Sequence, residues 1–265
     1  MLLACGDQGL MAHQNGWRAL PCPLNRVDMI ARDHHRIALL DNTAHAVWTG
    51  RRIIPVDSGI ESMLLWQDCL LTLSGDTDCL TLISSAGVPL FTTPAGVYPQ
   101  DMCLLPGQRS LAVCGGADST LRIIRLPELQ EEQAIRLHGS VQRAACLAGM
   151  LYALCTLEDD GLCCEMCRIQ VNRWQPLARW PGLPGCLHAD GAGGLWAASS
   201  ERLGFFRRGE YHAVAGEFGL IRHMDSRQGT LLASDPVLGQ CLLVSPRGEV
   251  HTLYAGDVQH AVFRQ

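Results

Sequence analysis

Side chains that can bind anions or transfer protons recur at matching positions of this sequence, 34 to 45 residues apart. The set consists of Asp28, Ser62, Asp101, Arg143, His188, Arg222 with His223, and Gln259 with His260. Two carboxylates, two guanidiniums and three imidazoles that converge on one site would bind an anionic or zwitterionic ligand. A histidine among them could also serve as a general acid or base, because its pKa is close to neutral.

Three histidines of this set, His188, His223 and His260, raise the question of a metal, since three neutral imidazoles make an open zinc or iron site. They lie far apart in the chain and show no spacing such as His-x-x-x-His. We therefore expect no metal and no cofactor.

The Cys163-Cys164-Glu165-Met166-Cys167 segment contains a Cys-x-x-Cys pattern, which elsewhere indicates zinc or redox chemistry. It falls on a predicted strand, where side chains three residues apart point to opposite faces. We interpret these cysteines as buried apolar side chains.

Hairpins with an acidic residue in the turn recur along the whole chain. The acids are Asp7, Asp41, Asp76, Asp118, Asp159, Glu201 and Asp235, 34 to 42 residues apart. Glycine-containing turns follow at regular distances, so each unit contains four short apolar strands. Seven such units indicate a repeat fold. The acids together could form a cation site, but Asp is typical of tight turns for its own backbone hydrogen bonds, and we prefer that explanation.

The last predicted strand decides how the repeats are arranged. The chain begins with the second strand of a unit, at 1–6, and ends with a spare first strand, at 258–263. If the C-terminal strand completes the N-terminal unit, a ring closes and its open edges disappear. We predict an all-β fold, a seven-bladed β-propeller of four-stranded antiparallel blades that spans 1–265 as one domain. The segment 126–137 is expected to be a long polar connection in the fourth blade.

In such a ring the recurring polar residues surround the mouth of a central channel. The predicted innermost strands are 27–32, 61–66, 100–105, 142–147, 186–190, 221–226 and 258–263. A plainer interpretation is that propeller channels are simply polar and filled with water. We favour it, because residue alternation alone fixes neither facing nor register.

Two hairpins resemble a known group of repeats. Residues 115–123, Gly-Gly-Ala-Asp-Ser-Thr-Leu-Arg-Ile, resemble the middle hairpin of a WD40 repeat, and 75–82 is a looser copy. No unit ends in the Trp-Asp pair of that family, and His138-Gly139 shows its Gly-His signal in reverse order. The resemblance to WD40-like and related repeats implies the propeller architecture.

Composition excludes several classes of function. Apolar residues make up 48% of the 265 residues and charged ones 18%, which allows a sizeable core. The net charge is −5, which disfavours nucleic acid as a partner. All 21 basic residues are Arg, so a lysine Schiff base is excluded. The 13 cysteines, many inside apolar runs, indicate a reducing, cytoplasmic location. No apolar run approaches the 18 residues of a membrane span.

Two functions remain open. We expect a non-catalytic scaffold that presents the channel-mouth face to a protein or peptide partner. The alternative is a small-ligand-binding or metal-assisted lyase or hydrolase, similar to the streptogramin lyases and lactonases. If the protein is such an enzyme, we expect His223, His260 or Asp101 to act catalytically. The ligand-binding residues at the channel mouth would be Asp28, Asp101, Arg143, His188, Arg222 and Gln259.

Overall fold

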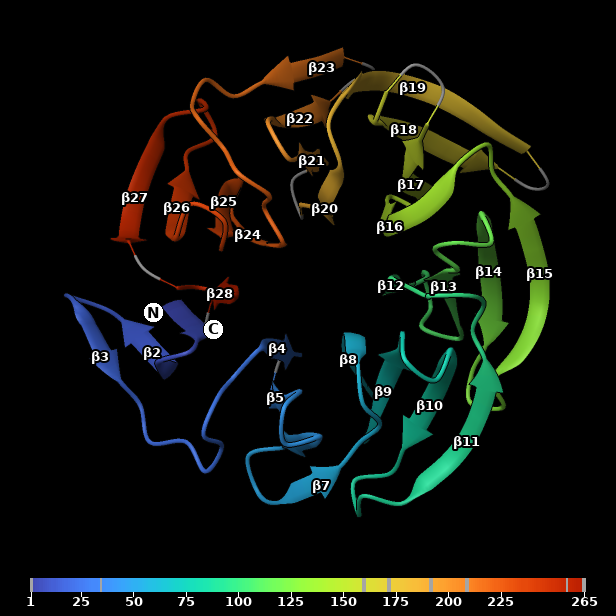
Figure 1. Cartoon of the computed structure of the whole chain (residues 1–265), viewed down its shortest axis with the longest axis vertical. Coiled ribbons are helices and arrows are strands. Elements are labelled where there is room, and N and C mark those ends of the chain that lie inside the picture. Colours follow the sequence, from blue (N-terminus) through green and yellow to red (C-terminus); the bar gives the residue numbers. More distant parts are fainter. Residues whose placement is uncertain are drawn as a thin grey trace.

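The computed structural model describes residues 2–33, 35–158, 161–170, 173–190, 193–207, 210–255 and 257–263. The strands of these residues form seven sheets of four antiparallel strands each. Figure 1 shows the sheets as seven blades around a central opening, which confirms the predicted β-propeller. Among the described residues we find no helical segment with the length and apolar character that a membrane crossing needs.

We number the blades in chain order and give each from its innermost strand outward. Blade 1 contains β28 (His260–Phe263), β1 (Leu2–Gly6), β2 (Gly9–His13) and β3 (Trp17–Ala19). Blade 2 contains β4 (Met29–Arg32), β5 (Ile37–Asp41), β6 (Ala46–Trp48) and β7 (Ile53–Pro55). Blade 3 contains β8 (Ile60–Trp66), β9 (Cys69–Ser74), β10 (Cys79–Ile83) and β11 (Pro89–Pro94). Blade 4 contains β12 (Asp101–Leu104), β13 (Ser110–Cys114), β14 (Thr120–Arg125) and β15 (Gln130–Arg136).

The other three blades repeat this order. Blade 5 contains β16 (Ser140–Leu147), β17 (Met150–Leu157), β18 (Cys163–Gln170) and β19 (Arg173–Pro181). Blade 6 contains β20 (Pro184–Ala189), β21 (Leu195–Ser199), β22 (Leu203–Arg207) and β23 (Glu210–Ala213). Blade 7 contains β24 (His223–Arg227), β25 (Thr230–Asp235), β26 (Gln240–Val244) and β27 (Val250–Ala255). All seven innermost strands overlap the predicted segments, and β8, β16, β20 and β24 extend one or two residues beyond them.

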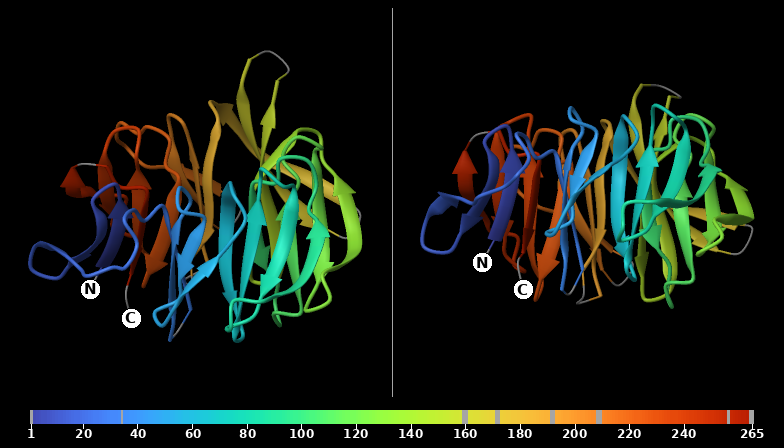
Figure 2. Two further views of the ribbon diagram at one scale, coloured as in Figure 1. Left: turned by 60° about the horizontal axis from the view of Figure 1, so that its bottom comes forward. Right: turned by 90° about the horizontal axis from the view of Figure 1, so that it is seen from below.

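Pairing of the C-terminal strand with the N-terminal strand closes the ring. β28 is antiparallel to β1, with Leu2 opposite Phe263 and Cys5 opposite His260. The two termini consequently lie beside each other on one face of the disc (Figures 1 and 2). The connections that lead into the innermost strands lie on the other face, which we call the mouth face.

The apolar core lies between blades rather than within one sheet. Each of the hydrophobic clusters formed by the described residues joins two neighbouring blades. One cluster packs Leu3 and Val262 of blade 1 against Leu39 of blade 2. The second strand of each blade is the most buried because blades cover it on both faces, as in β13 and β25.

One predicted connection is a strand instead. The segment 126–137 was expected to be a polar connection, but after a turn at 126–129 it forms β15, the outermost strand of blade 4. Its polar composition follows from this position, because one face of an outermost strand is in contact with water. Ile135 on its other face is buried.

The Cys-x-x-Cys pattern lies on β18, as expected. Cys164 packs in the cluster between blades 5 and 6, whereas Cys167 packs in the cluster between blades 4 and 5. The two thiols therefore lie on opposite faces of one sheet, which rules out a shared metal or a disulfide between them.

Closure by β28 makes a stability prediction. Replacing Val262 with Ala removes two buried methyl groups between blades 1 and 2 and should lower the free energy of unfolding by about 2 kcal/mol. His251 on β27 is exposed and serves as the control. The variant His251→Ala should change the free energy of unfolding by less than about 0.5 kcal/mol. Urea denaturation measures the free energy of unfolding of both variants. If Val262→Ala and His251→Ala lower it equally, β28 does not pack as described.

Candidate functional site

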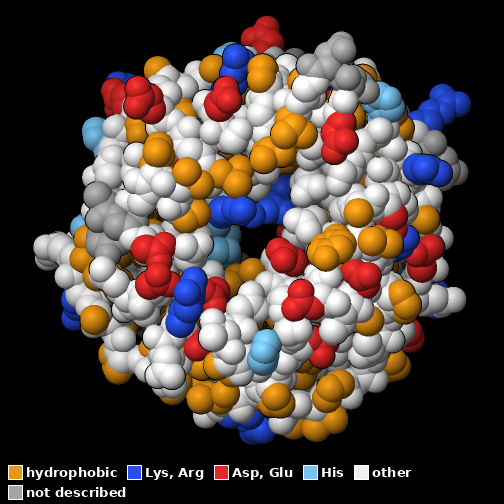
Figure 3. Space-filling view, in the orientation of Figure 1, with side chains coloured by type: hydrophobic (Ala, Val, Ile, Leu, Met, Phe, Trp, Pro, Cys, Tyr) orange, Lys and Arg blue, Asp and Glu red, His pale blue; other side chains and the backbone are white. Residues whose placement is uncertain are grey.

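The innermost strands enclose a channel of about 680 Å³. Polar side chains surround its mouth, and apolar ones such as Met63, Met102 and Leu104 line it further in. Figure 3 looks onto the mouth face and shows a hole with arginine side chains on one side and acidic side chains across from them. A concave cavity with converging polar groups is the place where a small ligand would bind.

The channel brings together most of the polar residues singled out from the sequence. Ser62, Asp101, Arg143, His188, Arg222, His223 and His260 line the cavity. Asp28 and Gln259 lie beside it and are not among the lining residues. The Asp28 carboxylate accepts hydrogen bonds from the Arg26 side chain and the Asn42 amide, and the Gln259 amide donates to Asp257. Both side chains thus bind neighbouring loop residues.

Most of these channel side chains bridge neighbouring inner strands. Asp101 of β12 accepts hydrogen bonds from the Ser62 hydroxyl on β8 (3.2 Å) and the Ala144 amide on β16 (3.2 Å). The Arg143 guanidinium donates to the Gln100 carbonyl (3.3 Å) and to the Gly185 carbonyl (2.8 Å). Their hydrogen-bonding capacity is therefore partly used within the protein.

Arg222 differs from the other channel residues. Its guanidinium has no hydrogen bond and no carboxylate at ion-pair distance within the described part of the chain. Burial lowers its pKa, and the positive charge of Arg143 lowers it further. The two guanidiniums thus repel each other at the channel mouth. Arg143 donates its hydrogen bonds to carbonyl oxygens, and the carboxylates of Asp101 and Glu61 act on it electrostatically without forming an ion pair in the described chain.

Glu61 completes this charged mouth and was not among the residues expected from the sequence. It sits in a β-bulge of β8, because the pairing with β9 shifts between Ile60 and Ser62. A bulge redirects a side chain, so strict alternation pointed to Ser62 instead. Burial raises the pKa of Glu61, and the two guanidiniums of Arg143 and Arg222 oppose that rise.

The histidines of blades 7 and 1 stack on each other, with ring centroids 3.6 Å apart. Nδ1 of His223 is 3.0 Å from the Ala261 carbonyl and must carry the proton to donate to it. Nδ1 of His260 accepts from the Ile30 amide (3.3 Å), so in the neutral ring its proton is on Nε2. Burial lowers the pKa of His223 to about 4, and burial together with His223 lowers the pKa of His260 well below its usual range. Both rings are neutral at pH 7.

A second carboxylate bridges the blades where the ring closes. Asp225 of β24 binds the Arg32 guanidinium of β4 through both oxygens, at 2.7 and 2.8 Å, and accepts from the Phe263 amide (2.7 Å). Next to it, Nε2 of His188 is 2.9 Å from the Ser226 hydroxyl. Sequence reasoning missed Arg32 and Asp225, although both occur on predicted inner strands and have opposite charge.

The cysteines that line the channel are not activated nucleophiles. Burial raises the pKa of Cys103 well above its usual range, and it raises the pKa of Cys186 to about 12. Burial also raises the pKa of the Asp101 carboxyl. Because the thiolate is the reactive form of cysteine, these thiols are unreactive near pH 7.

The described residues do not contain a group of three or more His, Cys, Asp or Glu side chains placed to hold a metal ion.

The acidic residues in the hairpin turns do not gather into a cation site in the described part of the chain. Asp41 and Asp235 accept hydrogen bonds from backbone amides, and Asp118 binds the Thr120 amide and Arg122. Asp159 lies outside the described residues.

The fold and this cavity define a seven-bladed β-propeller with a charged channel mouth. No protein-family model matches the sequence, and no curated protein does. Solved structures are similar in fold. A functionally unknown protein of Desulfotomaculum acetoxidans has a TM-score of 0.75 at 11% identity, covering 97% of each chain.

Two enzymes have the same fold. An inactive virginiamycin B lyase of Staphylococcus aureus with quinupristin has a TM-score of 0.68 at 10% identity, covering 85% of this chain and 83% of that one. Hydrazine synthase of Kuenenia stuttgartiensis has a TM-score of 0.70 at 9% identity, covering 88% and 80%. Likeness at such low identity extends to the fold only.

The stacked histidines His223 and His260 should make the free energy of unfolding depend on pH. Their pKa values are lower in the folded than in the unfolded chain, where a histidine titrates near 6.5. The unfolded chain therefore binds more protons, and the free energy of unfolding should fall as the pH drops from about 6.5 towards 4. Asn can replace the Nδ1 donor, so His223→Asn should reduce the slope of this fall. Urea denaturation between pH 4.5 and 7.5 measures it, and parallel wild-type and variant curves would contradict the prediction.

The bridge at the ring closure makes a second prediction for the site. Asp225→Ala leaves a partly buried guanidinium without its carboxylate and should cost about 3 kcal/mol of unfolding free energy. Because the two side chains interact, the double variant with Arg32→Ala should cost less than the sum of the single variants. A double-mutant cycle by urea denaturation tests this, and additive costs would contradict it.

Proposed function

We propose that the protein binds a small organic anion at the mouth of the central channel. The observation that carries this proposal is the pair of guanidiniums, Arg143 and Arg222, which both line the channel and repel each other, and neither has a carboxylate at ion-pair distance within the described chain. Two guanidiniums at the mouth of one cavity produce a positive potential that attracts an anion, and the single carboxylate of Glu61 offsets only part of it. Guanidiniums also suit carboxylates, which they bind through two parallel hydrogen bonds.

The groups around this pair support a ligand with further polar atoms. The Glu61 carboxylate interacts electrostatically with both guanidiniums, so it would bind a hydroxyl or cationic group of the same ligand. Deeper in the channel, the neutral rings provide an acceptor at Nε2 of His223 and a donor at Nε2 of His260. The channel volume of about 680 Å³ suits a small molecule.

Binding is better supported than acid–base catalysis by the stacked histidines. A general base works best when its pKa is near the working pH, whereas the pKa of His223 is about 4. Asp101 holds two neighbouring strands through its oxygens. A role in catalysis for His223, His260 or Asp101 would need a ligand that displaces these contacts.

Anion titrations test the proposed function. Citrate, succinate and inorganic phosphate are the anionic probes, and succinamide is the neutral control, each followed by isothermal titration calorimetry at low ionic strength. We expect at least one anion to bind and succinamide not to bind. Arg222→Gln should weaken the binding by about tenfold, because one of the two charges is lost.

The matched control for that variant lies on the same strand. Arg227 is at the other end of β24 and exposed, so Arg227→Gln changes the net charge equally while leaving the mouth intact. Equal weakening by both variants, or no binding of any anion at millimolar concentration, would refute a site at the channel mouth.

A second candidate function, docking of a protein or peptide on the mouth face, is favoured by exposed apolar side chains. Six large ones lie on connections of this face: Val97, Tyr98, Leu162, Leu183, Val237 and Leu238. Exposed apolar clusters are typical of interaction sites.

Affinity capture of partners with the variants Val237→Asp and Leu238→Asp tests docking on the mouth face. The control is Leu90→Asp, on the outer strand β11. Capture that all variants retain would exclude docking through these side chains.

A further inference from the structure

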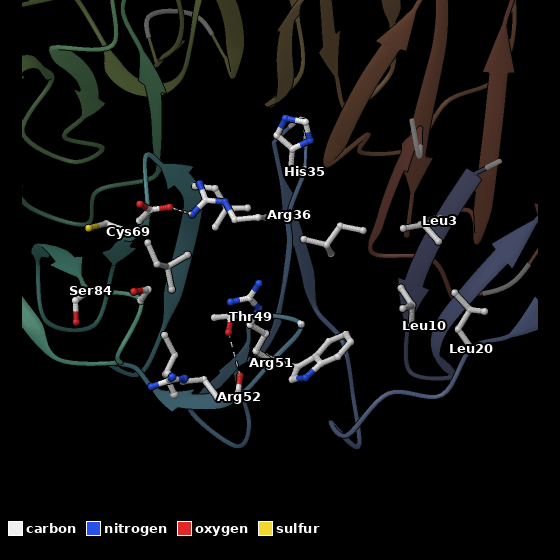
Figure 4. A pocket seen from close by; sticks show the side chains of 18 of the residues that line it. Leu3, Leu10, Leu20, His35, Arg36, Thr49, Arg51, Arg52, Cys69 and Ser84 are labelled. Atoms are coloured by element: carbon white, nitrogen blue, oxygen red, sulfur yellow. Dashed lines mark hydrogen bonds and ion pairs between the residues drawn. The ribbon is translucent and has the colours of Figure 1, made fainter.

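A second cavity lies on the face opposite the channel mouth, at the lower ends of blades 1, 2 and 3 (Figure 4). It has a volume of about 810 Å³ and shares with the channel only the side chain of Leu65. Its lining comes from strands of these three blades and from the turns at 33–36, 49–52 and 84–87. The cavity is thus separate from the proposed anion site.

The small size of blade 2 produces this space. Its two outer strands, β6 and β7, have three residues each, as does the outermost strand β3 of blade 1. Neighbouring blades are longer, for example β9 and β11 of blade 3 with six residues each. Short strands next to long ones leave the lower ends of the neighbouring blades uncovered.

The walls of this cavity are apolar. Leu3, Leu10, Ile54 and Leu70 contribute buried side chains, and Trp48 is half-buried. The other apolar lining residues are Leu20, Pro21, Ile37 and Leu65. Such a wall would bind a hydrocarbon or aromatic body through the hydrophobic effect.

The rim of the cavity is positively charged. The turn between β6 and β7 presents Arg51 and Arg52, and Gly50 permits this tight turn with a φ of +83°. In the described part of the chain, neither arginine has a carboxylate at ion-pair distance. The Arg52 guanidinium donates a hydrogen bond to the Ala86 carbonyl (3.3 Å). Figure 4 shows both side chains at the cavity together with Arg36.

The acidic residues of this region do not neutralise the rim. Asp33 binds Arg36 at 2.7 Å and so compensates that third guanidinium. Asp68 lies 3.8 Å from Arg36 and is fully exposed. Two guanidiniums thus remain uncompensated beside an apolar wall, although the whole chain is acidic, with a net charge of −5.

We infer that this cavity binds an amphipathic molecule with an apolar body and a single anionic head, such as a medium-chain carboxylate. The body would lie against Leu10, Leu20 and Trp48, and the head would be bound by Arg51 and Arg52. A volume of this size is typical of ligand pockets. The inference does not depend on the anion site of the channel, because no charged residue lines both cavities.

Probes that share one chain and differ in the head group test this inference. Decanoate, decanol and decyltrimethylammonium are titrated into the full-length protein below their micelle concentrations and followed by calorimetry. We expect decanoate to bind most tightly and the cationic probe most weakly. The double variant Arg51→Gln/Arg52→Gln should weaken decanoate by about tenfold and leave decanol unchanged.

Matched variants separate this site from unspecific binding and from the channel. Arg109 and Arg247 are exposed on turns of the same face in blades 4 and 7, so Arg109→Gln/Arg247→Gln alters the charge equally and should leave decanoate binding unchanged. Arg222→Gln in the channel should leave it unchanged as well. Equal binding of decanoate and decanol, or equal losses in both double variants, would overturn the proposal.

Discussion

The inner strands of this propeller belong to different sheets, so polar side chains must join them across the channel wall. Asp101 connects blade 4 to blades 3 and 5, and Asp225 connects blade 7 to blades 1 and 2. Arg143, His223 and His260 add further bridges of the same kind. Because buried polar groups are stable only when hydrogen-bonded, these contacts hold neighbouring innermost strands together along the channel wall.

This constraint explains which channel residues are free for a ligand. Side chains that bridge two blades have little hydrogen-bonding capacity left, and their loss would disturb the wall. Arg222 and Glu61 have no such bridging role among the described contacts, and Arg143 donates to carbonyls without an ion pair to any described carboxylate. The polar channel therefore contains groups that join neighbouring blades and groups that the proposed ligand would contact, and only the contacts of each side chain distinguish the two kinds.

The two cavities follow from different properties of the same repeat. The channel exists because seven wedges meet around an axis, and its chemistry depends on the polar side chains on the innermost strands and just before them. The cavity below blade 2 exists because the repeats are unequal, with three-residue strands β6 and β7 beside six-residue strands in blade 3. Inequality of repeats thus provides a second site that is absent from an ideal ring.

The sequence by itself determined the number of blades, the closing pair of β28 with β1 and the strands of each blade except β15, the outermost one of blade 4, because turn residues and apolar runs recur at a readable spacing. It also brought most of the polar channel residues into one set. Only the tertiary structure decided their roles. The bulge at Glu61 depends on how β8 pairs with β9, and the bridges made by Asp225 depend on contacts between blades far apart in the sequence. Within the described residues the Arg222 guanidinium has no hydrogen bond, and local alternation records none of these features.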